Sequence, residues 1–201
     1  VPAAKTGGGV GAGAAVGVVV GKLGTATADI NEVLRELAGQ DGAQDAPHLL
    51  SLPAACTQVA RWQEQGFKVG FTNGCFDIVH PGHVSLLAQA RANCDRLVVA
   101  LNTDASIRRL KGESRPVNSL QARAAVMAAI RYVDAVVAFD EDTPLELISA
   151  LRPDVLVKGA DYRPENVVGA DVVLAAGGRL VLADLQEGQS TTAIIGRVLG
   201  T

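Results

Sequence analysis

Five short apolar runs recur along the chain, separated by polar or amphipathic segments. They cover residues 68–72, 97–101, 135–139, 154–157 and 179–183. Apolar runs of this length, bounded by turn residues, are typical of strands buried on both faces. Helical patterns are predicted between and after them, near 83–93, 119–131, 144–151, 165–176 and 191–199. The alternation predicts a Rossmann-like, doubly wound α/β fold with one parallel sheet of about five strands.

The first part of the chain differs from the rest in composition. Residues 1–40 are rich in Gly, Ala and Val, and they end in an amphipathic segment with helical spacing at 30–37. Residues 39–47 have the composition of a linker. We therefore expect a short N-terminal piece over 1–45 and one α/β domain over 46–201.

An apolar run at 10–20, following Lys5, resembles a signal peptide, but glycines interrupt it and it is too short for a membrane-spanning helix. The chain begins with Val, and we expect it to derive from a longer parent. Its three cysteines show no CxxC spacing, a pattern that fits reduced thiols. These features together predict a cytoplasmic protein.

Composition narrows the choice of partner. With 48% hydrophobic residues the chain can build a full core, and its net charge is −3. That charge does not suit broad electrostatic capture of nucleic acid, and no membrane partner is expected. If the substrates are phosphates, a few placed cations and backbone N–H groups must bind them.

The segment directly after the first apolar run carries the strongest chemical signal. It reads TNGCFDIVHPGH over residues 72–83, and Pro81 suits the first turn of a helix. His80 and His83 are three residues apart, so both imidazoles can lie on one side of the helix start, beside free N–H donors. A helix cap plus a packed core histidine would also explain the pair, and a metal site lacks further ligands at suitable spacing. We favour phosphate chemistry.

A second candidate lies near the end of the chain, where EGQSTT precedes the last helical pattern. Ser190 or Thr191 is a natural N-cap, and the hydroxyls and N–H groups there could hold phosphate oxygens. A plain N-cap is the alternative.

Two further segments place cations near expected strand ends. Residues 110–118 form a polar loop with Lys111 and Arg115, for which a solvated loop is the alternative interpretation. Lys158 and Asp161 follow the fourth apolar run, and a surface ion pair would also account for them.

The motifs TNGxFDxxHxGH, LKGxSRPVN, RxxVMxAI, VDxVVxFxEDTP, LRPDVLVKGxDY and GxSTTxII occur in this order. In that order they resemble the adenylyltransferase half of the bifunctional heptose 7-phosphate kinase/heptose 1-phosphate adenylyltransferases of Gram-negative bacteria. The resemblance runs from about 62 to 199. Residues 14–27 are similar to the last helix and strand of that family's ribokinase-like half. The resemblance thus implies that 1–45 is a kinase remnant without kinase activity.

The resemblance implies an HxGH nucleotidyltransferase fold and an activity. AMP would pass from ATP, with Mg²⁺, to D-glycero-β-D-manno-heptose 1-phosphate, giving ADP-heptose and pyrophosphate for lipopolysaccharide core biosynthesis. A homo-oligomer is expected. One alternative is a cytidylyltransferase for a small alcohol phosphate such as glycerol 3-phosphate, because residues 131–134 match those enzymes. Another is a non-catalytic nucleotide-binding remnant.

The resemblance also implies roles for single residues. Catalytic contacts to phosphate are expected from His80, His83 and Lys111. Nucleotide binding is expected from Thr72, Asn73, Gly74, Cys75, Phe76, Asp161, Ser190, Thr191 and Thr192. Binding of the sugar phosphate is expected from Asp77, Arg115 and Lys158. No side-chain ligand to a metal is assigned.

Overall fold

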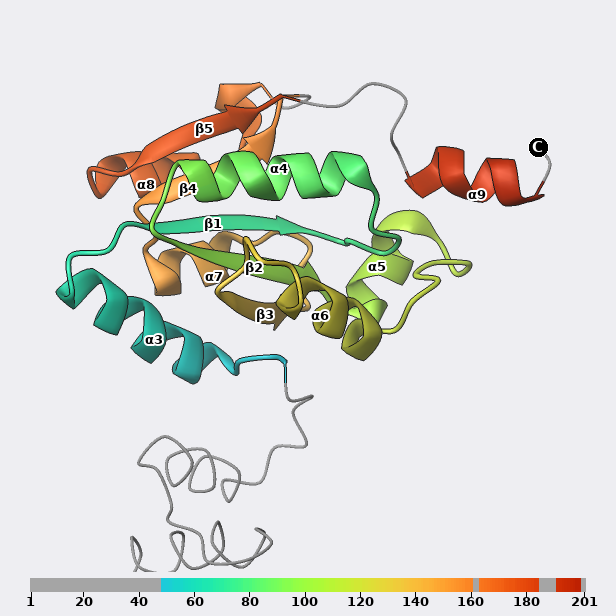
Figure 1. Ribbon diagram of the computed structural model, residues 1–201, viewed down its shortest axis with the longest axis horizontal. Helices are drawn as coiled ribbons and strands as arrows, with labels where there is room; N and C mark the ends of the chain where they lie inside the picture. Colours follow the sequence, from blue (N-terminus) through green and yellow to red (C-terminus); the bar gives the residue numbers. More distant parts are fainter. Residues whose placement is uncertain (1–47, 161–162, 185–190, 200–201) are drawn as a thin grey trace, which may run out of the picture. The chain divides into compact units, whose positions relative to one another are not determined.

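The computed structural model describes residues 48–160, 163–184 and 191–199. Five strands form one parallel sheet in the order β3-β2-β1-β4-β5 (Figure 1). They are β1 Val69–Gly74, β2 Arg96–Asn102, β3 Ala135–Phe139, β4 Val155–Gly159 and β5 Arg179–Ala183. Each predicted strand coincides with an observed one, with ends that differ by at most two residues. The α/β fold with a five-stranded parallel sheet is confirmed.

Helices connect the strands. They are α3 Leu52–Glu64, α4 Pro81–Ala92, α5 Asp104–Lys111, α6 Leu120–Ala128, α7 Leu145–Leu151, α8 Ala170–Ala175 and α9 Thr191–Leu199, with a short 3-10 helix η1 at Pro164–Asn166. The single helix predicted over 165–176 is wrong, because the chain breaks at Gly169. That residue has φ +82°, and a Cβ there would lie 2.6 Å from Cδ1 of Ile148.

Two observed helices, α3 and α5, were not predicted, and the loop expected over 110–118 begins inside α5. Leu110 and Lys111 form the last turn of that helix. Thr103 caps the start of α5 by accepting a hydrogen bond from the backbone N–H of Ser106 at 3.1 Å. Three cationic side chains lie in its last turn, where positive charge interacts favourably with the negative end of the helix dipole. Charge and capping therefore help to stabilise a helix that is short and has few apolar residues.

The helices cover both faces of the sheet. Side chains alternate between the two faces along each strand, so each face carries apolar residues that need covering. One core packs α3, α7 and α8 against the face that carries Phe71 and Val98. The other packs α4 and α6 against the face that carries Leu97 and Val99. The strands are thus buried on both sides, as their continuous apolar runs predict.

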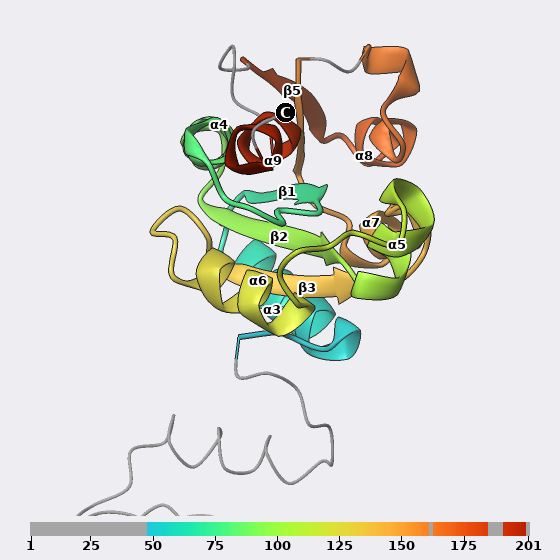
Figure 2. The same cartoon turned by 90° about the vertical axis from the view of Figure 1, so that its right-hand side faces the viewer.

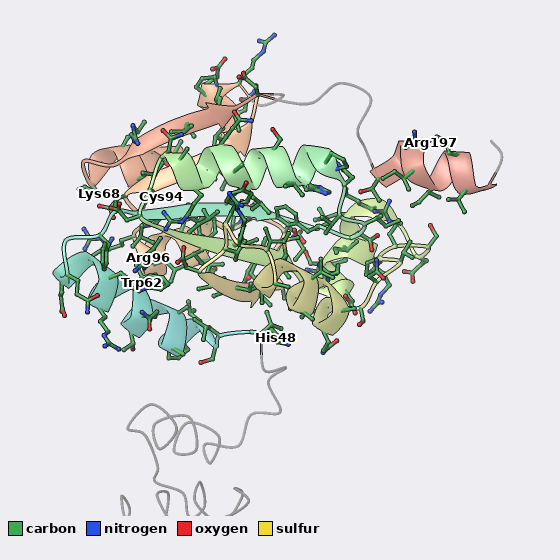
Figure 3. The ribbon with its side chains drawn as sticks, viewed as in Figure 1. His48, Trp62, Lys68, Cys94, Arg96 and Arg197 are labelled. Carbon is green, nitrogen blue, oxygen red and sulfur yellow. The ribbon has the colours of Figure 1, made fainter. Side chains whose placement is uncertain are left out.

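The strand order reverses at β1, which has β2 on one side and β4 on the other. Ligands in such sheets bind in the crevice at the carboxyl ends of the strands, near this switch point. Figure 1 shows α5 and α9 at the end of the sheet to which the arrow of β1 points, and Figure 2, which faces that end, shows them apart from each other. Trp62, Lys68, Cys94 and Arg96 lie at the opposite end of the sheet (Figure 3). The carboxyl end of β1 is therefore the expected position of a ligand-binding site.

Leu50 extends the sheet beyond β3. Its backbone N–H donates to the carbonyl of Val136 at 2.9 Å, and it forms an isolated parallel bridge with Val137. The residues just before α3 are therefore joined to the α/β domain. The N-terminal features expected over 1–45 lie outside the described residues. Within the described part, no helix is long and apolar enough to cross a membrane.

Candidate active site

The chain leaves β1 through a tight turn that ends at α4. Phe76, within this turn, has φ +45°, a left-handed conformation that is unusual for a residue with a side chain. Its buried ring packs against the ring of His83, with centroids 5.0 Å apart. A strained residue held by packing next to polar groups is a common feature of functional sites.

The two histidines meet at the start of α4, as their spacing predicts. His80 occupies the N-cap position in an extended conformation, and Pro81 begins the helix. The imidazole rings of His80 and His83 stack with centroids 3.8 Å apart and planes 26° from parallel. The Nδ1 atoms of both rings are buried and have no hydrogen-bond partner among the described residues. A bound polar group is the natural partner for such atoms.

The site keeps both imidazoles neutral. Burial lowers the pKa of His83 to about 4. Repulsion from Lys111, and from His80 whenever that ring is protonated, adds to the effect, and a hydrogen bond with the backbone of Ile78 opposes it in part. Burial also lowers the pKa of His80. Each neutral ring can still donate one hydrogen bond, and a bound anion would favour the charged form. The arrangement therefore suits a phosphate group that gains negative charge.

A pocket of about 600 Å³ opens beside His80, along the outer face of α4. Apart from His80 its walls are mainly apolar, formed by Val79, Pro81, Val84, Ser85 and Ala88. Near it, the hydroxyl of Thr191, the first residue of α9, donates to the carbonyl of Ile78 at 3.5 Å. The start of α9 is thus brought next to the turn that precedes α4.

A second pocket, of about 350 Å³, lies at the carboxyl ends of the strands. Its polar lining comprises Asn73, Cys75, Asn102, Lys111, Asp142, Thr143, Lys158 and Asn166. Apolar atoms of Leu110, Phe139, Pro144 and Val168 complete it. Lys158, on β4, donates from Nζ to Oδ1 of Asn73, on β1, at 2.5 Å. This contact joins the two strands at the switch point.

The carboxylate of Asp77 holds the loop that follows α5. It accepts hydrogen bonds from Nε of Arg115 at 2.7 Å and from the backbone N–H groups of Val117 and Asn118, each at 2.9 Å. Burial alone raises the pKa of Asp77, but these donors outweigh that effect and lower the pKa below its usual value. Asp77 therefore stays ionised and shapes the loop between α5 and α6.

Arg123, on α6, is an organising residue that the sequence did not reveal. It is only 1% exposed. Its guanidinium donates to the carbonyls of Cys75, Asn102 and Asn118 at 2.7 to 3.1 Å and to Asp104 Oδ1 at 2.8 Å. A lone Arg within the otherwise apolar and small residues of the RxxVMxAI motif was the available signal.

Asn102 is a second residue that sequence reasoning missed. It ends β2 and is 5% exposed, and its amide donates to the hydroxyl of Ser106 at 3.1 Å. Its position at the carboxyl end of an expected strand was the only signal in the sequence. That signal is weak, because Asn is also common in turns.

The structure brings five of the expected residues together at the carboxyl edge of the sheet. Asn73, Gly74, Cys75, Lys111 and Lys158 line the polar pocket, whereas Thr72, on β1, is buried at 1% exposure. Asp161 and Ser190 lie outside the described residues, and the side chain of Thr192 is not described either.

In the described part of the chain, no group of three or more His, Cys, Asp or Glu side chains could hold a metal ion.

The fold and the stacked histidines define a class, and comparison with known proteins identifies the same class. The chain matches the cytidylyltransferase-like family model over residues 71–196. This match covers both histidines, the polar pocket and the start of α9. The chain belongs to the cytidylyltransferase-like family of nucleotidyltransferases, as the motifs predicted.

Individual relatives are more similar still. The chain is 71% identical over 189 residues to the bifunctional protein HldE of Gluconacetobacter diazotrophicus, an alignment that covers 93% of this chain and 39% of that protein. It is 61% identical over 188 residues to the bifunctional protein HldE of Azorhizobium caulinodans, with 92% and 39% covered. The chain thus spans about two fifths of the length of these relatives.

Two solved structures share the fold. A lipopolysaccharide core biosynthesis protein from Thermoplasma volcanium superposes with a TM-score of 0.51 at 22% identity, over 62% of this chain and 100% of that one. A pantoate–β-alanine ligase from Francisella tularensis superposes with a TM-score of 0.51 at 14% identity, over 71% and 67%. At these identities the likeness supports the fold alone.

The lowered pKa of His83 makes folding stability depend on pH. The unfolded chain takes up this proton near pH 6.5 and the folded chain only near pH 4, so between these values the unfolded state binds more protons. The free energy of unfolding should fall as pH is lowered through this window. In His83→Gln the fall should be smaller, whereas His48→Gln, which changes an exposed histidine, should behave as wild type. Urea unfolding at several pH values measures this, and equal slopes in wild type and His83→Gln would contradict it.

Proposed function

We propose that this chain transfers AMP from ATP to a sugar 1-phosphate, D-glycero-β-D-manno-heptose 1-phosphate, giving ADP-heptose and pyrophosphate. The product would serve lipopolysaccharide core biosynthesis. The observation that carries the proposal is the pair of stacked, neutral histidines whose unpartnered Nδ1 atoms lie at a helix start. His80 lines the apolar-walled pocket, and His83 is within electrostatic reach of Lys111, which lines the polar pocket.

The chemistry of the two pockets supports an assignment of the substrates. The pocket beside His80 has mainly apolar walls and lies near the start of α9, which suits a nucleoside with its phosphates on helix N-termini. The polar pocket offers two lysines for a phosphate, together with amides and a carboxylate for sugar hydroxyls. We assign ATP to the first pocket and the sugar phosphate to the second. Asn73, Gly74 and Cys75, for which the resemblance implies nucleotide binding, line the second pocket, so we propose that they contact the acceptor instead.

The roles of individual residues follow from this assignment. His80 and His83 would donate hydrogen bonds to the α-phosphate as charge develops there. Lys111 lines the polar pocket and also acts electrostatically on His83, so its charge would reach the phosphates of both substrates. Lys158 would hold the sugar phosphate and orient Asn73. Asp77 and Arg115, which contact each other, would act on the substrate through the loop that they shape.

The reaction needs no covalent intermediate. The anomeric phosphate of the sugar is already ionised, so it can attack the α-phosphorus of ATP without a strong general base. Oxygen forms a bond to the phosphorus as the bond to pyrophosphate breaks, and pyrophosphate carries away the charge. The protein contributes by positioning and by stabilising charge.

ATP would bind with Mg²⁺. Because the described residues form no cluster suited to a metal, the phosphate oxygens themselves would be its main ligands, and we assign no step to the ion. The need for ATP agrees with a cytoplasmic location. We retain a homo-oligomer as a proposal.

Similarity to the HldE proteins supports this function, as does the motif resemblance. Since the chain spans only about two fifths of those relatives, the proposal concerns nucleotidyl transfer alone.

Substrate preference can be measured as pyrophosphate release from a matrix of two nucleotides and two acceptors. ATP with heptose 1-phosphate should give the highest kcat/KM. Faster release from CTP with glycerol 3-phosphate would assign the chain to the cytidylyltransferases instead. No release from any combination would indicate a non-catalytic nucleotide-binding protein.

The histidine pair can be tested by truncation. His83→Ala should lower kcat about 100-fold to 1000-fold, the effect of losing one preorganised donor, with a smaller change in KM for ATP. His48→Ala is the matched control, because His48 is exposed and lies near the start of α3, away from the site (Figure 3). Steady-state kinetics of both variants provides the measurement. Turnover of His83→Ala within a few-fold of the control would remove the histidine from the mechanism.

A further inference from the structure

Two segments far apart in the sequence form facing parts of the polar pocket. Leu110 and Lys111 come from the last turn of α5, and Asp142, Thr143 and Pro144 come from the segment between β3 and α7. The distance between these segments limits what the pocket can admit. Whatever fixes it also fixes Lys111, the cation that we place on the phosphates.

Arg109 joins the two segments directly. Its Nε lies 3.2 Å from Oδ1 of Asp142, and its Nη1 lies 3.3 Å from Oδ2 of Asp140. Its Nη2 also donates to the backbone carbonyl of Asp140. The guanidinium of Arg109 therefore binds one backbone carbonyl and two carboxylates of the facing segment at once. A lysine could not reproduce this geometry.

The same segment is attached to the start of α5. The backbone N–H of Thr103 donates to the carbonyl of Phe139 at 2.9 Å, and the Thr103 hydroxyl contacts Asp140. The first part of the helix is also anchored by the buried Ser106 and Ile107. Beyond them Leu110 is 51% exposed and Lys111 is exposed as well. Among the described residues, Arg109 is thus the side chain that ties the last turn of α5 to the facing segment.

Arg109 also affects the charge at the pocket. Asp142 is one of the residues that line it, and an unpaired carboxylate there would repel the phosphate of an incoming sugar phosphate. The ion pair with Arg109 neutralises that carboxylate while leaving Lys111 and Lys158 to attract the phosphate.

We propose that Arg109 is a positioning residue for the acceptor: it holds the last turn of α5 against residues 140–142 and neutralises Asp142, and so sets the affinity for the sugar phosphate. This inference rests on the proposed function, because it takes the polar pocket as the acceptor site. Arg109 does not touch substrate. Its loss should therefore weaken acceptor binding and leave the chemical step intact.

Arg108 provides a matched control. It is the preceding residue on the same helix, carries the same charge and is exposed, and no contact of its side chain is recorded in the described structure. Arg109→Gln should raise KM for heptose 1-phosphate about fivefold, the scale of an exposed ion-pair network, with kcat and the KM for ATP within about twofold. Arg108→Gln should match wild type in all three. Asp142→Asn should add little to Arg109→Gln, because the two side chains act through one contact.

Hydrogen exchange gives a readout independent of activity. Amides of residues 108–111 should exchange faster in Arg109→Gln than in Arg108→Gln, because the last turn has lost its attachment. Equal exchange in the two variants would overturn the proposal, as would equal KM values for the sugar phosphate. A uniform loss across kcat and both KM values would also overturn it. If wild type releases no pyrophosphate, the proposed function fails, and the exchange comparison still decides whether Arg109 holds α5.

Discussion

The buried guanidinium of Arg123 is the interaction on which the arrangement of the site depends. A charge removed from water must be fully paired, and this one is paired with three backbone carbonyls and the carboxylate of Asp104. The carbonyls belong to the turn after β1, the end of β2 and the loop before α6. Losing the guanidinium would leave these buried acceptors without their donor, so the three segments keep one relative position. The carboxylate of Asp77 has a similar role with the opposite charge, because it accepts hydrogen bonds from the loop of Arg115 to Asn118 and so fixes that loop.

This framework explains how the histidines can remain neutral and available. His83 packs against Phe76, whose left-handed backbone is fixed by the same turn that Arg123 holds at Cys75. Burial lowers the pKa of both imidazoles, and their Nδ1 atoms keep no partner within the described protein. Donors that are already oriented need little reorganisation when phosphate charge develops, which is the main source of electrostatic catalysis. A site built this way works by position rather than by a reactive nucleophile.

Much of this could be read from the sequence, because the signals were local. Buried parallel strands appear as apolar runs, and the His80/His83 spacing fixes both rings on one side of a helix start. The missing parts are long-range. Asp77 meets Arg115 across 38 residues, and Arg123 meets Cys75 across 48, so no window of sequence shows either contact. Helix α5 escaped prediction because capping and terminal charges define it more clearly than its apolar pattern does.

Positioning without a covalent intermediate is the central claim, and the stereochemical course at the α-phosphorus tests it most directly. A single diastereomer of ATP with sulfur on the α-phosphate would be converted with heptose 1-phosphate, and the configuration of the product determined by ³¹P NMR. Direct in-line attack by the sugar phosphate predicts inversion. Retention would require two displacements through an adenylylated residue, for which His80 or His83, the side chains placed on the α-phosphate, would be the first candidate, and it would contradict the account.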